Sequence, residues 1–580
     1  MKLILKELPV YGADLPVDLQ DMGKCQLTGL FRQVWNIDGK DRSVLTYITE
    51  GLHYNRPCLI VAPPSDMDAQ SFLEHSGFVK FAEKNQVFVI VLEKDGECWD
   101  FKGKDADFMN RVYEKVQARE YYVVMQDCIY GWGFGDGSVI AQQAVMKRAS
   151  EWSGLATAGA FNEMVMLNSG SIIDLESGSQ NDEMYIAAQK SQMPVWIMTD
   201  NIGVNENQVI NYWKRENNSQ MDPLYDKQGT EIYLPENIKK TSKINDDNIA
   251  QTRISKNIKA TVPDIELLDY VWEYIGTARR HRGYGNKILR YYREPIANGA
   301  TYHTLEVDGM RREWYEYVPE QVKREKKKVP LVVAFHGRGG NGESFFDITD
   351  MSVVAEERKF IAVFPTADIY QIKENGLRSV RVWNGSYKDN KIDSEKFVRA
   401  MIADIKDRNL IDEGRVYACG QSSGGYMSSY CGMAASDIFT AVSPWSGISC
   451  PNEEGAFSYQ GQSYFSSGNI PYFVLVGDQD KFYNAKTFWP LTEDNIMVKF
   501  IKILIEKFNL QEEPGIYDCY PITYYVWKNR KGTPMLKAGI VKNMPHANYA
   551  EESRIAYDEF LSKFSKDENG NLLYMGKAAE

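Results

Sequence analysis

The run Arg415-Val416-Tyr417-Ala418-Cys419-Gly420-Gln421-Ser422-Ser423-Gly424 decides the fold prediction. Residues 415–419 are typical of a buried strand, and residues 426–430 continue as a helix. Between them lies a G-x-S-x-G motif, whose glycines permit a tight strand-to-helix turn that lifts Ser422 above the sheet edge. About 0.2 chance matches are expected in a chain of this length, so the motif alone leaves an ordinary glycine-rich turn open.

Short apolar runs flank this motif on both sides. They alternate with longer amphipathic stretches and are bounded by glycine and proline, which is typical of an α/β protein with a mainly parallel sheet and helices on both faces. Ligands of such sheets bind at the carboxyl ends of the strands, so functional residues are expected directly after the runs. The predicted strands are Leu331–Phe335, Phe360–Phe364, Val416–Cys419, Phe439–Val442, Tyr472–Val476 and Ala538–Val541.

A serine hydroxyl needs a neighbouring base to become a nucleophile. In this fold the partners follow in the order serine, acid, histidine. Of the six histidines only His546 follows Ser422, in a loop after the last predicted strand. The acid is expected just after residues 472–476. We choose Asp480, because a G-x-x-D turn leaves room for its carboxylate to reach the histidine, and Asp478 is the alternative.

An oxyanion site needs hydrogen-bond donors near the nucleophile. Residues 335–340, Phe-His-Gly-Arg-Gly-Gly, follow a predicted strand and form a loop of the kind that supplies a backbone N–H. We expect the backbone amides of Arg338 and Ser423 to hold the oxyanion. His336 precedes both predicted partners of Ser422 and is expected to be a structural, hydrogen-bonded residue.

These residues together resemble an esterase family of α/β-hydrolases that contains poly(3-hydroxybutyrate) depolymerases, feruloyl esterases and acetylxylan esterases. The resemblance covers about residues 300–565. The matching pieces are Val307-Asp308-Gly309, Tyr317-Val318-Pro319, His336-Gly337, Gly420–Gly424, Gly477–Asp480 and Met544–Asn548.

The resemblance implies a Ser422, Asp480 and His546 triad and an acyl-enzyme mechanism. Trp383 resembles a tryptophan near the cleft of this family and is expected to contact substrate, with a core tryptophan as the alternative. Gln421 is the second expected substrate contact. Arg338 stands where depolymerases tend to have a small residue or cysteine, which disfavours a polyester substrate.

The two halves of the chain repeat one pattern. Residues 37–50 align without a gap on residues 307–320, a shift of 270, and Pro57–Ala62 aligns on Pro330–Phe335 at a shift of 273. Two copies of one α/β-hydrolase-like domain are therefore predicted, residues 1–295 and 296–580. The basic cluster Arg279–Arg282 near the boundary is interpreted as a solvated linker or helix end, with an anionic docking patch as the alternative.

The first copy is predicted to lack hydrolase chemistry. Each position that carries a catalytic element in the second copy has lost it in the first. Ser138 is the only nearby hydroxyl and is expected to face away from the cleft. The alignment places Gly135 over Ser422, Pro63-Pro64 over His336-Gly337, Gly203 over Asp480 and Asp264 over His546.

Composition limits the partners. The net charge of −12 argues against nucleic acid, which requires a basic face. No apolar run reaches the 18 residues of a membrane span. The eight cysteines show no metal-binding spacing, so a zinc site is not expected. The predicted acyl-enzyme mechanism needs neither a metal nor an organic cofactor. The start of the chain favours a cytoplasmic location, or secretion if a leader was removed. The oligomeric state is left open.

The predicted activity is that of a serine esterase acting on a small-molecule or oligosaccharide ester. Feruloyl or acetyl esters of plant polysaccharide are the first choice, on the strength of the resemblance. Polyhydroxyalkanoate or other short-chain esters are the second. A serine peptidase of the same fold is the third, because the nucleophile turn does not distinguish esters from amides.

Overall fold

The structure is a computed structural model of the chain. The structure describes all residues except 1, 10–14, 16–17, 117–123, 125–126, 160, 162–164, 166–191, 237–246, 259–260, 283–286, 374–376, 384–392, 450–456, 460–461, 465–467, 484, 493 and 580.

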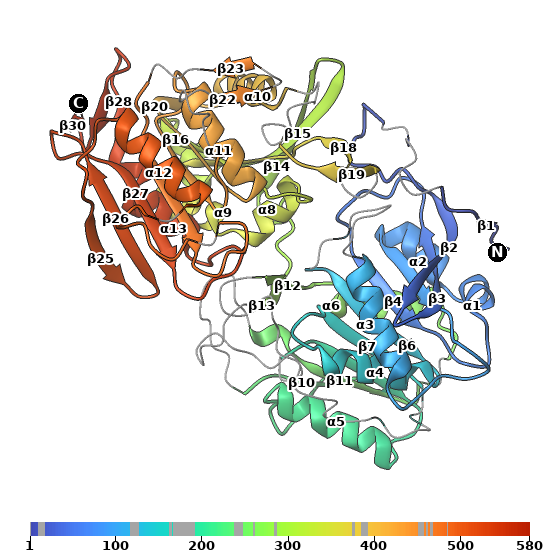
Figure 1. Cartoon of the computed structure of the whole chain (residues 1–580). Coiled ribbons are helices and arrows are strands. Elements are labelled where there is room, and N and C mark those ends of the chain that lie inside the picture. Colours follow the sequence, from blue (N-terminus) through green and yellow to red (C-terminus); the bar gives the residue numbers. More distant parts are fainter. Residues whose placement is uncertain are drawn as a thin grey trace.

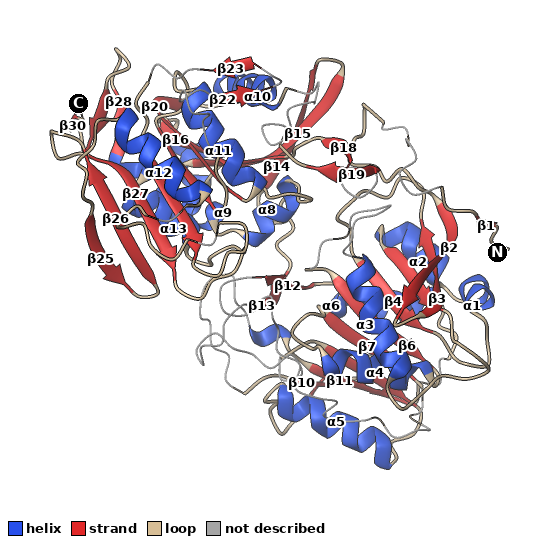
Figure 2. Ribbon diagram, viewed as in Figure 1, coloured by secondary structure: helices blue, strands red, loops and turns tan. Residues whose placement is uncertain are grey.

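Two large sheets, one in each half of the chain, form the frame of the molecule (Figures 1 and 2). The six inner strands of the first sheet, β5-β4-β6-β7-β8-β11, are parallel, and antiparallel pairs extend it at both sides. In spatial order its strands are β1 (Leu5–Lys6), β2 (Gly29–Ile37), β3 (Lys40–Ile48), β5 (Phe88–Leu92), β4 (Cys58–Ala62), β6 (Ile129–Phe134), β7 (Gly154–Ala158), β8 (Val195–Thr199), β11 (Thr252–Lys256), β10 (Glu231–Tyr233) and β9 (Leu224–Tyr225).

The second sheet has the same arrangement. Its six inner strands, β17-β16-β20-β21-β24-β27, are parallel, so the predicted fold class is confirmed. Four of the six predicted runs lie wholly within these strands, whereas β17 begins one residue after Phe360 and β21 begins two residues after Phe439. In spatial order its strands are β14 (Ala300–Val307), β15 (Met310–Tyr317), β17 (Ile361–Pro365), β16 (Val329–Phe335), β20 (Ile411–Gln421), β21 (Ala441–Trp445), β24 (Tyr472–Gly477), β27 (Pro534–Val541), β26 (Ile522–Lys528) and β25 (Gly515–Cys519).

The sequence shifts between the halves reappear as matching strand positions. β5 and β17 begin at Phe88 and Ile361, 273 residues apart, and each lies beside the strand that carries the first apolar run. Each sheet also has a hairpin closed by an Asp-Gly turn in which both residues have positive φ, at residues 38–39 and 308–309. Such turns fit the right-handed twist of paired strands. The division at residues 295 and 296 stays a prediction.

Helices cover both faces of each sheet (Figure 2). In the first half, apolar side chains of α3, α4 and α5 form one core and those of α1, α2 and α6 form the other. Alternate residues of β4 enter the two cores, as the two-residue period of a strand requires. The first-half helices are α1 (Ala69–His75), α2 (Phe78–Asn85), α3 (Lys104–Val116), α4 (Gly137–Lys147), α5 (Val204–Glu216) and α6 (Ile265–Ile275).

One large core holds the second half together. Helices α9 and α13 pack side by side: the rings of Phe360 and Tyr557 stack 4.2 Å apart in this core, and an Arg358–Asp558 ion pair at 2.8 Å lies outside it. The helices are α7 (Glu320–Glu325), α8 (Gly342–Ile348), α9 (Met351–Arg358), α10 (Ser394–Arg408), α11 (Ser423–Ala434), α12 (Ile496–Lys507) and α13 (Glu552–Glu559).

The basic cluster near residue 280 differs from its interpretation as a solvated linker or helix end. Residues 278–282 form strand β12, which pairs with β13 (Lys287–Tyr291) in a ribbon between the two sheets (Figure 1). Arg279, Arg280 and His281 are all buried. The backbone amide of Arg280 donates to the carbonyl of Asp127 at 2.9 Å, and its side-chain Nε donates to the carbonyl of Trp152 at 2.6 Å. The side chains are buried because they have specific acceptors that a charge count does not reveal.

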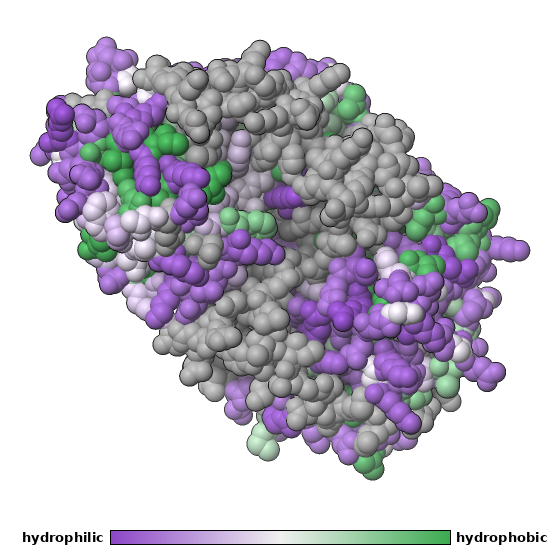
Figure 3. Space-filling view, viewed as in Figure 1, coloured by the Kyte–Doolittle hydropathy of each residue, from purple (hydrophilic) through white to green (hydrophobic). Residues whose placement is uncertain are grey.

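No helix in the described part of the chain is long and apolar enough to cross a lipid bilayer. On the face drawn in Figure 3, hydrophilic residues dominate the coloured surface, and hydrophobic residues form only small separate patches.

Candidate active site

The turn between β20 and α11 holds Ser422 in a strained conformation. Its φ is +55° and its ψ is −116°, a region that side-chain-bearing residues rarely adopt. The amide of Ser422 donates to the carbonyl of Trp445 at 2.9 Å. A Cβ on Gly424 would lie 1.9 Å from the carbonyl oxygen of Phe335, so the motif glycine permits a close approach of helix and strand. These contacts fix the serine at the carboxyl end of the sheet.

Three side chains from separate strand ends meet at this turn. His546 Nε2 lies 2.9 Å from Ser422 Oγ, and His546 Nδ1 lies 2.8 Å from Asp480 Oδ2. Asp480 is fully buried, and its second oxygen accepts the amide N–H of Phe482 at 2.9 Å. The geometry suits transfer of the serine proton to an imidazole that a carboxylate holds in one tautomer.

Asp478, the alternative acid, lies in a different environment. Its Oδ1 accepts the backbone N–H of Asn543 at 2.6 Å, and its own amide donates to the carbonyl of Val541. The side chain therefore ties the turn after β24 to the loop that carries His546. The structure brings Asp480, and not Asp478, to the imidazole.

The buried carboxyl group of Glu552 accepts hydrogen bonds from the loop that carries His546. It accepts from Asn548 Nδ2 at 2.5 Å and from the amide of Tyr549 at 3.0 Å. Burial raises the pKa of Glu552 to about 8. The group was not singled out in the sequence, because a glutamate at the start of a helix is ordinarily exposed.

Replacing Glu552 is expected to change the pH dependence of stability. Because folding raises its pKa, its contribution to stability is complete below the ordinary pKa of 4.5 and is lost as the pH rises through about 8. The difference in melting temperature, wild type minus Glu552→Gln, should therefore decrease as the pH is raised from 5 to 9. Glu551→Gln is the control. A Glu552→Gln difference that is constant across this range would contradict the assignment.

The loop after β16 lies against the nucleophile turn. A Cβ on Gly337 would come within 3.5 Å of Ser422 Cβ. The amides of Gly339 and Gly340 are engaged inside the structure, by the carbonyls of Arg381 at 2.7 Å and of Gly337 at 3.0 Å. The predicted donor Arg338 lies in this loop next to Gly337.

The second predicted donor, Ser423, is the first residue of α11. The first amides of a helix have no partner within it, and its N-terminal end is electropositive. The hydroxyl of Ser423 accepts the amide N–H of Trp383 at 3.1 Å. Loop 336–340 and the start of α11 thus flank Ser422, which is the placement an oxyanion site needs.

His336 is a structural residue, as expected. Its Nε2 accepts the amide N–H of Ala367 at 2.9 Å, and its Nδ1 donates to the carbonyl of Gly337 at 2.7 Å. Burial lowers the pKa of His336 to about 3, which keeps the imidazole neutral. The ring therefore holds the loop through both nitrogens.

Trp383 and Gln421 lie against the loop of residues 336–340. Trp383 is fully buried; its indole N–H donates to the carbonyl of His336 at 2.9 Å and its ring packs against Phe335. This corresponds to the core alternative, in contrast to the expected substrate contact. Gln421 is buried, and its Oε1 would lie 2.5 Å from a Cβ on Gly337. The packing of both side chains could not be read from the motif.

An exposed aromatic residue beside the site, Phe482, was missed. The residue is 63% exposed, and its ring lies edge-to-face with the His546 ring, with 4.6 Å between the centroids. The sequence feature that could have predicted it is its position two residues after Asp480, in the turn that follows strand β24.

In the first half, the equivalent turn keeps the backbone without the chemistry. Gly135 has φ +56°, close to that of Ser422, and its amide donates to Ala158 as that of Ser422 does to Trp445. A Cβ on Gly135 would lie 3.0 Å from the ring of Pro64. The other aligned positions carry structural roles.

The nearby hydroxyl of the first half points inward. Ser138 is fully buried and donates to the carbonyls of Gly133 and Ala158. Asp264, aligned with His546, caps α6 by accepting the amide of Leu267 at 2.9 Å.

Comparison with known proteins relates the second half to esterases. Residues 314–463 match the family described as Esterase PHB depolymerase. Feruloyl esterase B of Thermothelomyces thermophilus is 27% identical over 148 residues, and feruloyl esterase B of Neurospora crassa is 26% identical over 144 residues. Each match covers 25% of this chain and 47% of the relative, so this chain spans about half the length of these relatives.

Among solved structures, an acetyl xylan esterase from Aspergillus awamori matches 45% of this chain and 99% of its own, at 14% identity and a TM-score of 0.33. The strand order, the nucleophile turn and the matched segment lie in the same half of the chain. The second half therefore has the fold of an α/β-hydrolase, and its residues 314–463 are similar to the esterase family of PHB depolymerases.

Proposed function

We propose that this chain is a serine carboxylic-ester hydrolase whose chemistry lies in residues 296–580. The observation that carries the proposal is the continuous contact from Ser422 Oγ through His546 to the buried Asp480. Its relationship to esterases supports the same class of reaction.

The reaction proceeds in two acyl-transfer steps. His546 Nε2 takes the proton of Ser422 as Oγ attacks the ester carbonyl, and the resulting oxyanion is held by backbone amides of Arg338 and Ser423. The imidazolium then gives the proton to the alcohol leaving group, which yields the acyl-serine. In the second step His546 activates a water, whose attack releases the acid and restores the serine. Asp480 stabilises the imidazolium in both steps.

The substrates we propose are feruloyl or acetyl esters of plant polysaccharide. Support comes from the relatives named feruloyl esterase B. Short-chain or polyhydroxyalkanoate esters are the second candidate. For residues 1–295 we propose a domain without hydrolase activity, supported by Gly135 at the nucleophile position and by the ring of Pro64 against it.

A substrate panel tests the proposed substrate class. Turnover of the full chain would be measured with methyl ferulate, a phenyl acetate, an ester of 3-hydroxybutyrate and a peptide anilide. The expected order of kcat/KM has ferulate or acetate first and the peptide last. A kcat/KM that is higher for the peptide than for the esters would overturn the ester proposal. A value that is highest for the 3-hydroxybutyrate ester would make polyhydroxyalkanoate esters the substrate class in place of feruloyl and acetyl esters.

A further inference from the structure

Helix α8 of the second half is held from the first half of the chain. The side chain of Glu343, in its first turn, accepts from Arg56 Nη1 at 3.2 Å. Arg56 lies just before β4, one of the inner parallel strands of the first sheet. The hydroxyl of Tyr292, in the segment that connects the halves, donates to the same oxygen.

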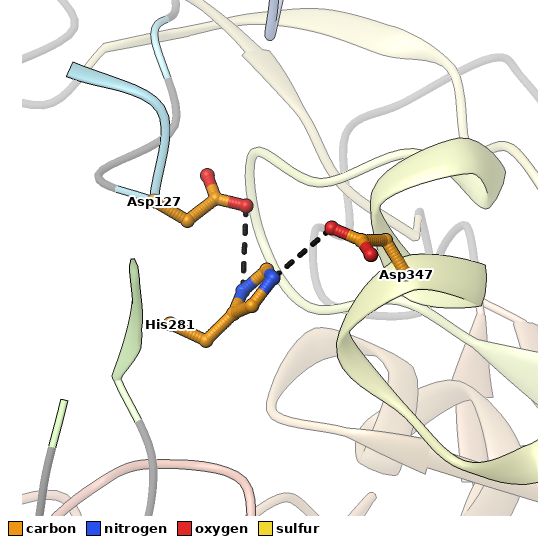
Figure 4. Close-up of side chains that lie close together, drawn as sticks. All are labelled: Asp127, His281 and Asp347. Carbon is orange, nitrogen blue, oxygen red and sulfur yellow. Dashed lines mark hydrogen bonds and ion pairs between the residues drawn. The ribbon is translucent and has the colours of Figure 1, made fainter. Parts of the chain in front are cut away.

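A second group of contacts holds the other end of the helix. Figure 4 shows the His281 ring between Asp127, of the first half, and Asp347, of α8. His281 Nδ1 lies 3.3 Å from Asp127 Oδ2, and His281 Nε2 lies 3.1 Å from Asp347 Oδ2. All three side chains are buried. The ring therefore bridges carboxylates from the two halves.

These three side chains are also of the types that bind metal ions, but a guanidinium group already fills the cluster. Arg290 bonds to Asp347 Oδ1 and lies against His281 Nε2. The amide of Arg293 donates to Asp347 Oδ1 at 2.8 Å, and its guanidinium donates to the carbonyl of the same residue at 2.8 Å. The cluster is thus an ion-pair network between the halves. Buried charges are tolerated when they are paired in this way.

Helix α8 begins where the loop of residues 336–340, the proposed oxyanion loop, ends. Asn341 caps the helix and follows Gly340 directly, so loop 336–340 has no spacer before α8. The amide of Gly342 donates to Thr366 Oγ1 at 3.0 Å, and a Cβ on Gly342 would lie 2.2 Å from the carbonyl of Phe364. A displacement of α8 would therefore move the loop that lies against Ser422.

The other anchor of this loop also contacts the first half. The carbonyl of Arg381, at the end of β19 (Leu377–Arg381), accepts the amide of Gly339 at 2.7 Å. The partner strand β18 (Ile369–Lys373) begins with Ile369, whose side chain is buried in the apolar core of the first half. Gly23 lies beside the same arginine, since a Cβ there would be 3.2 Å from Arg381 Nη2. Figure 1 shows this hairpin between the two sheets.

We propose that the first half acts as a positioning domain for the oxyanion loop, through α8 on one side and through the β18–β19 hairpin on the other. The inference rests on the proposed function. Arg56 and Tyr292 are positioning residues, because they act through Glu343 and touch no reacting atom. Their contribution falls on the transition state, in which the oxyanion forms, more than on binding of the ground-state ester.

The test is Arg56→Ala in the full chain, with kcat and KM measured on the best ester of the panel. The expected result is a fall in kcat of about tenfold with KM changed less than twofold, since removal of a whole oxyanion donor costs about 10² to 10³. Arg56→Lys, which keeps the charge, should recover part of the loss. Tyr292→Phe, which removes one hydroxyl, should lower kcat in the same direction by a smaller factor.

Arg32→Ala is the matched control. Arg32 pairs with Glu93 within the first half, and the side-chain exposures of this pair, 46% and 20%, are close to the 38% and 19% of Arg56 and Glu343. Its kcat should equal that of the wild type. Equal kcat values for folded Arg56→Ala, Tyr292→Phe and Arg32→Ala would overturn the positioning role, as would an effect on KM alone. A wild-type chain without ester turnover would instead refute the proposed function.

Discussion

Ser422→Ala is expected to abolish ester hydrolysis, with kcat reduced by about 10⁶. The substitution removes only the hydroxyl group, whose oxygen lies 2.9 Å from His546 Nε2. The fold should survive, because the substitution removes no buried core volume and the turn keeps its backbone contact to Trp445. Turnover would be measured on the best ester of the panel, with circular dichroism to verify folding.

Ser423→Ala serves as the control for this variant. It loses one hydrogen bond, from the amide of Trp383, but keeps the backbone amide proposed to hold the oxyanion. A loss of at most about tenfold is expected, since one ordinary hydrogen bond contributes about 1 kcal/mol. If folded Ser422→Ala kept more than a few per cent of wild-type turnover, Ser422 would not be the nucleophile.

Asp480→Asn is expected to lower kcat by about 10⁴, because an amide stabilises the wrong imidazole tautomer. The carboxylate lies 2.8 Å from His546 Nδ1 and is fully buried, so no water can replace its role. The loss should appear in kcat more than in KM, and the measurement is a full Michaelis–Menten series.

Asp478→Asn is the matched comparison, in the same turn and with the same change of side chain. An asparagine oxygen can still accept the amide N–H of Asn543, so a loss below about tenfold is expected. The reverse ranking of the two variants would transfer the acid role to Asp478 and contradict the arrangement proposed here.

Much of the second half could be predicted because its signals are local. Each of the six apolar runs overlaps a strand, since a parallel strand that is buried on both faces needs a continuous apolar stretch. The order of Ser422, Asp480 and His546 along the chain selected the three side chains that the structure brings together. The strand ends place them at one edge of the sheet.

Features that depend on contacts between distant segments could not be predicted. The charge of Arg279 and Arg280 suggested exposure, whereas Tyr130 OH and backbone carbonyls of the first half accept their hydrogen bonds. His281 was grouped with them, and its two aspartate neighbours lie 154 and 66 residues away in the sequence. A local pattern carries no information about such partners.

Trp383 illustrates the same limit at the site itself. A tryptophan near a predicted cleft fits both a substrate contact and a core position, and only the packing of Phe335 and His336 around its ring places it in the interior. Phe482 is the converse case, an aromatic residue that the fold leaves exposed beside His546.

A covalent adduct would identify the nucleophile whatever the natural substrate is. The full chain would be treated with a fluorophosphonate, which reacts with an activated serine, and the modified residue would be located by peptide mass spectrometry. The expected result is one adduct per chain, on Ser422, and no adduct in the Ser422→Ala chain. An adduct on Ser138 or elsewhere in residues 1–295, or ester turnover that persists without modification of Ser422, would contradict it.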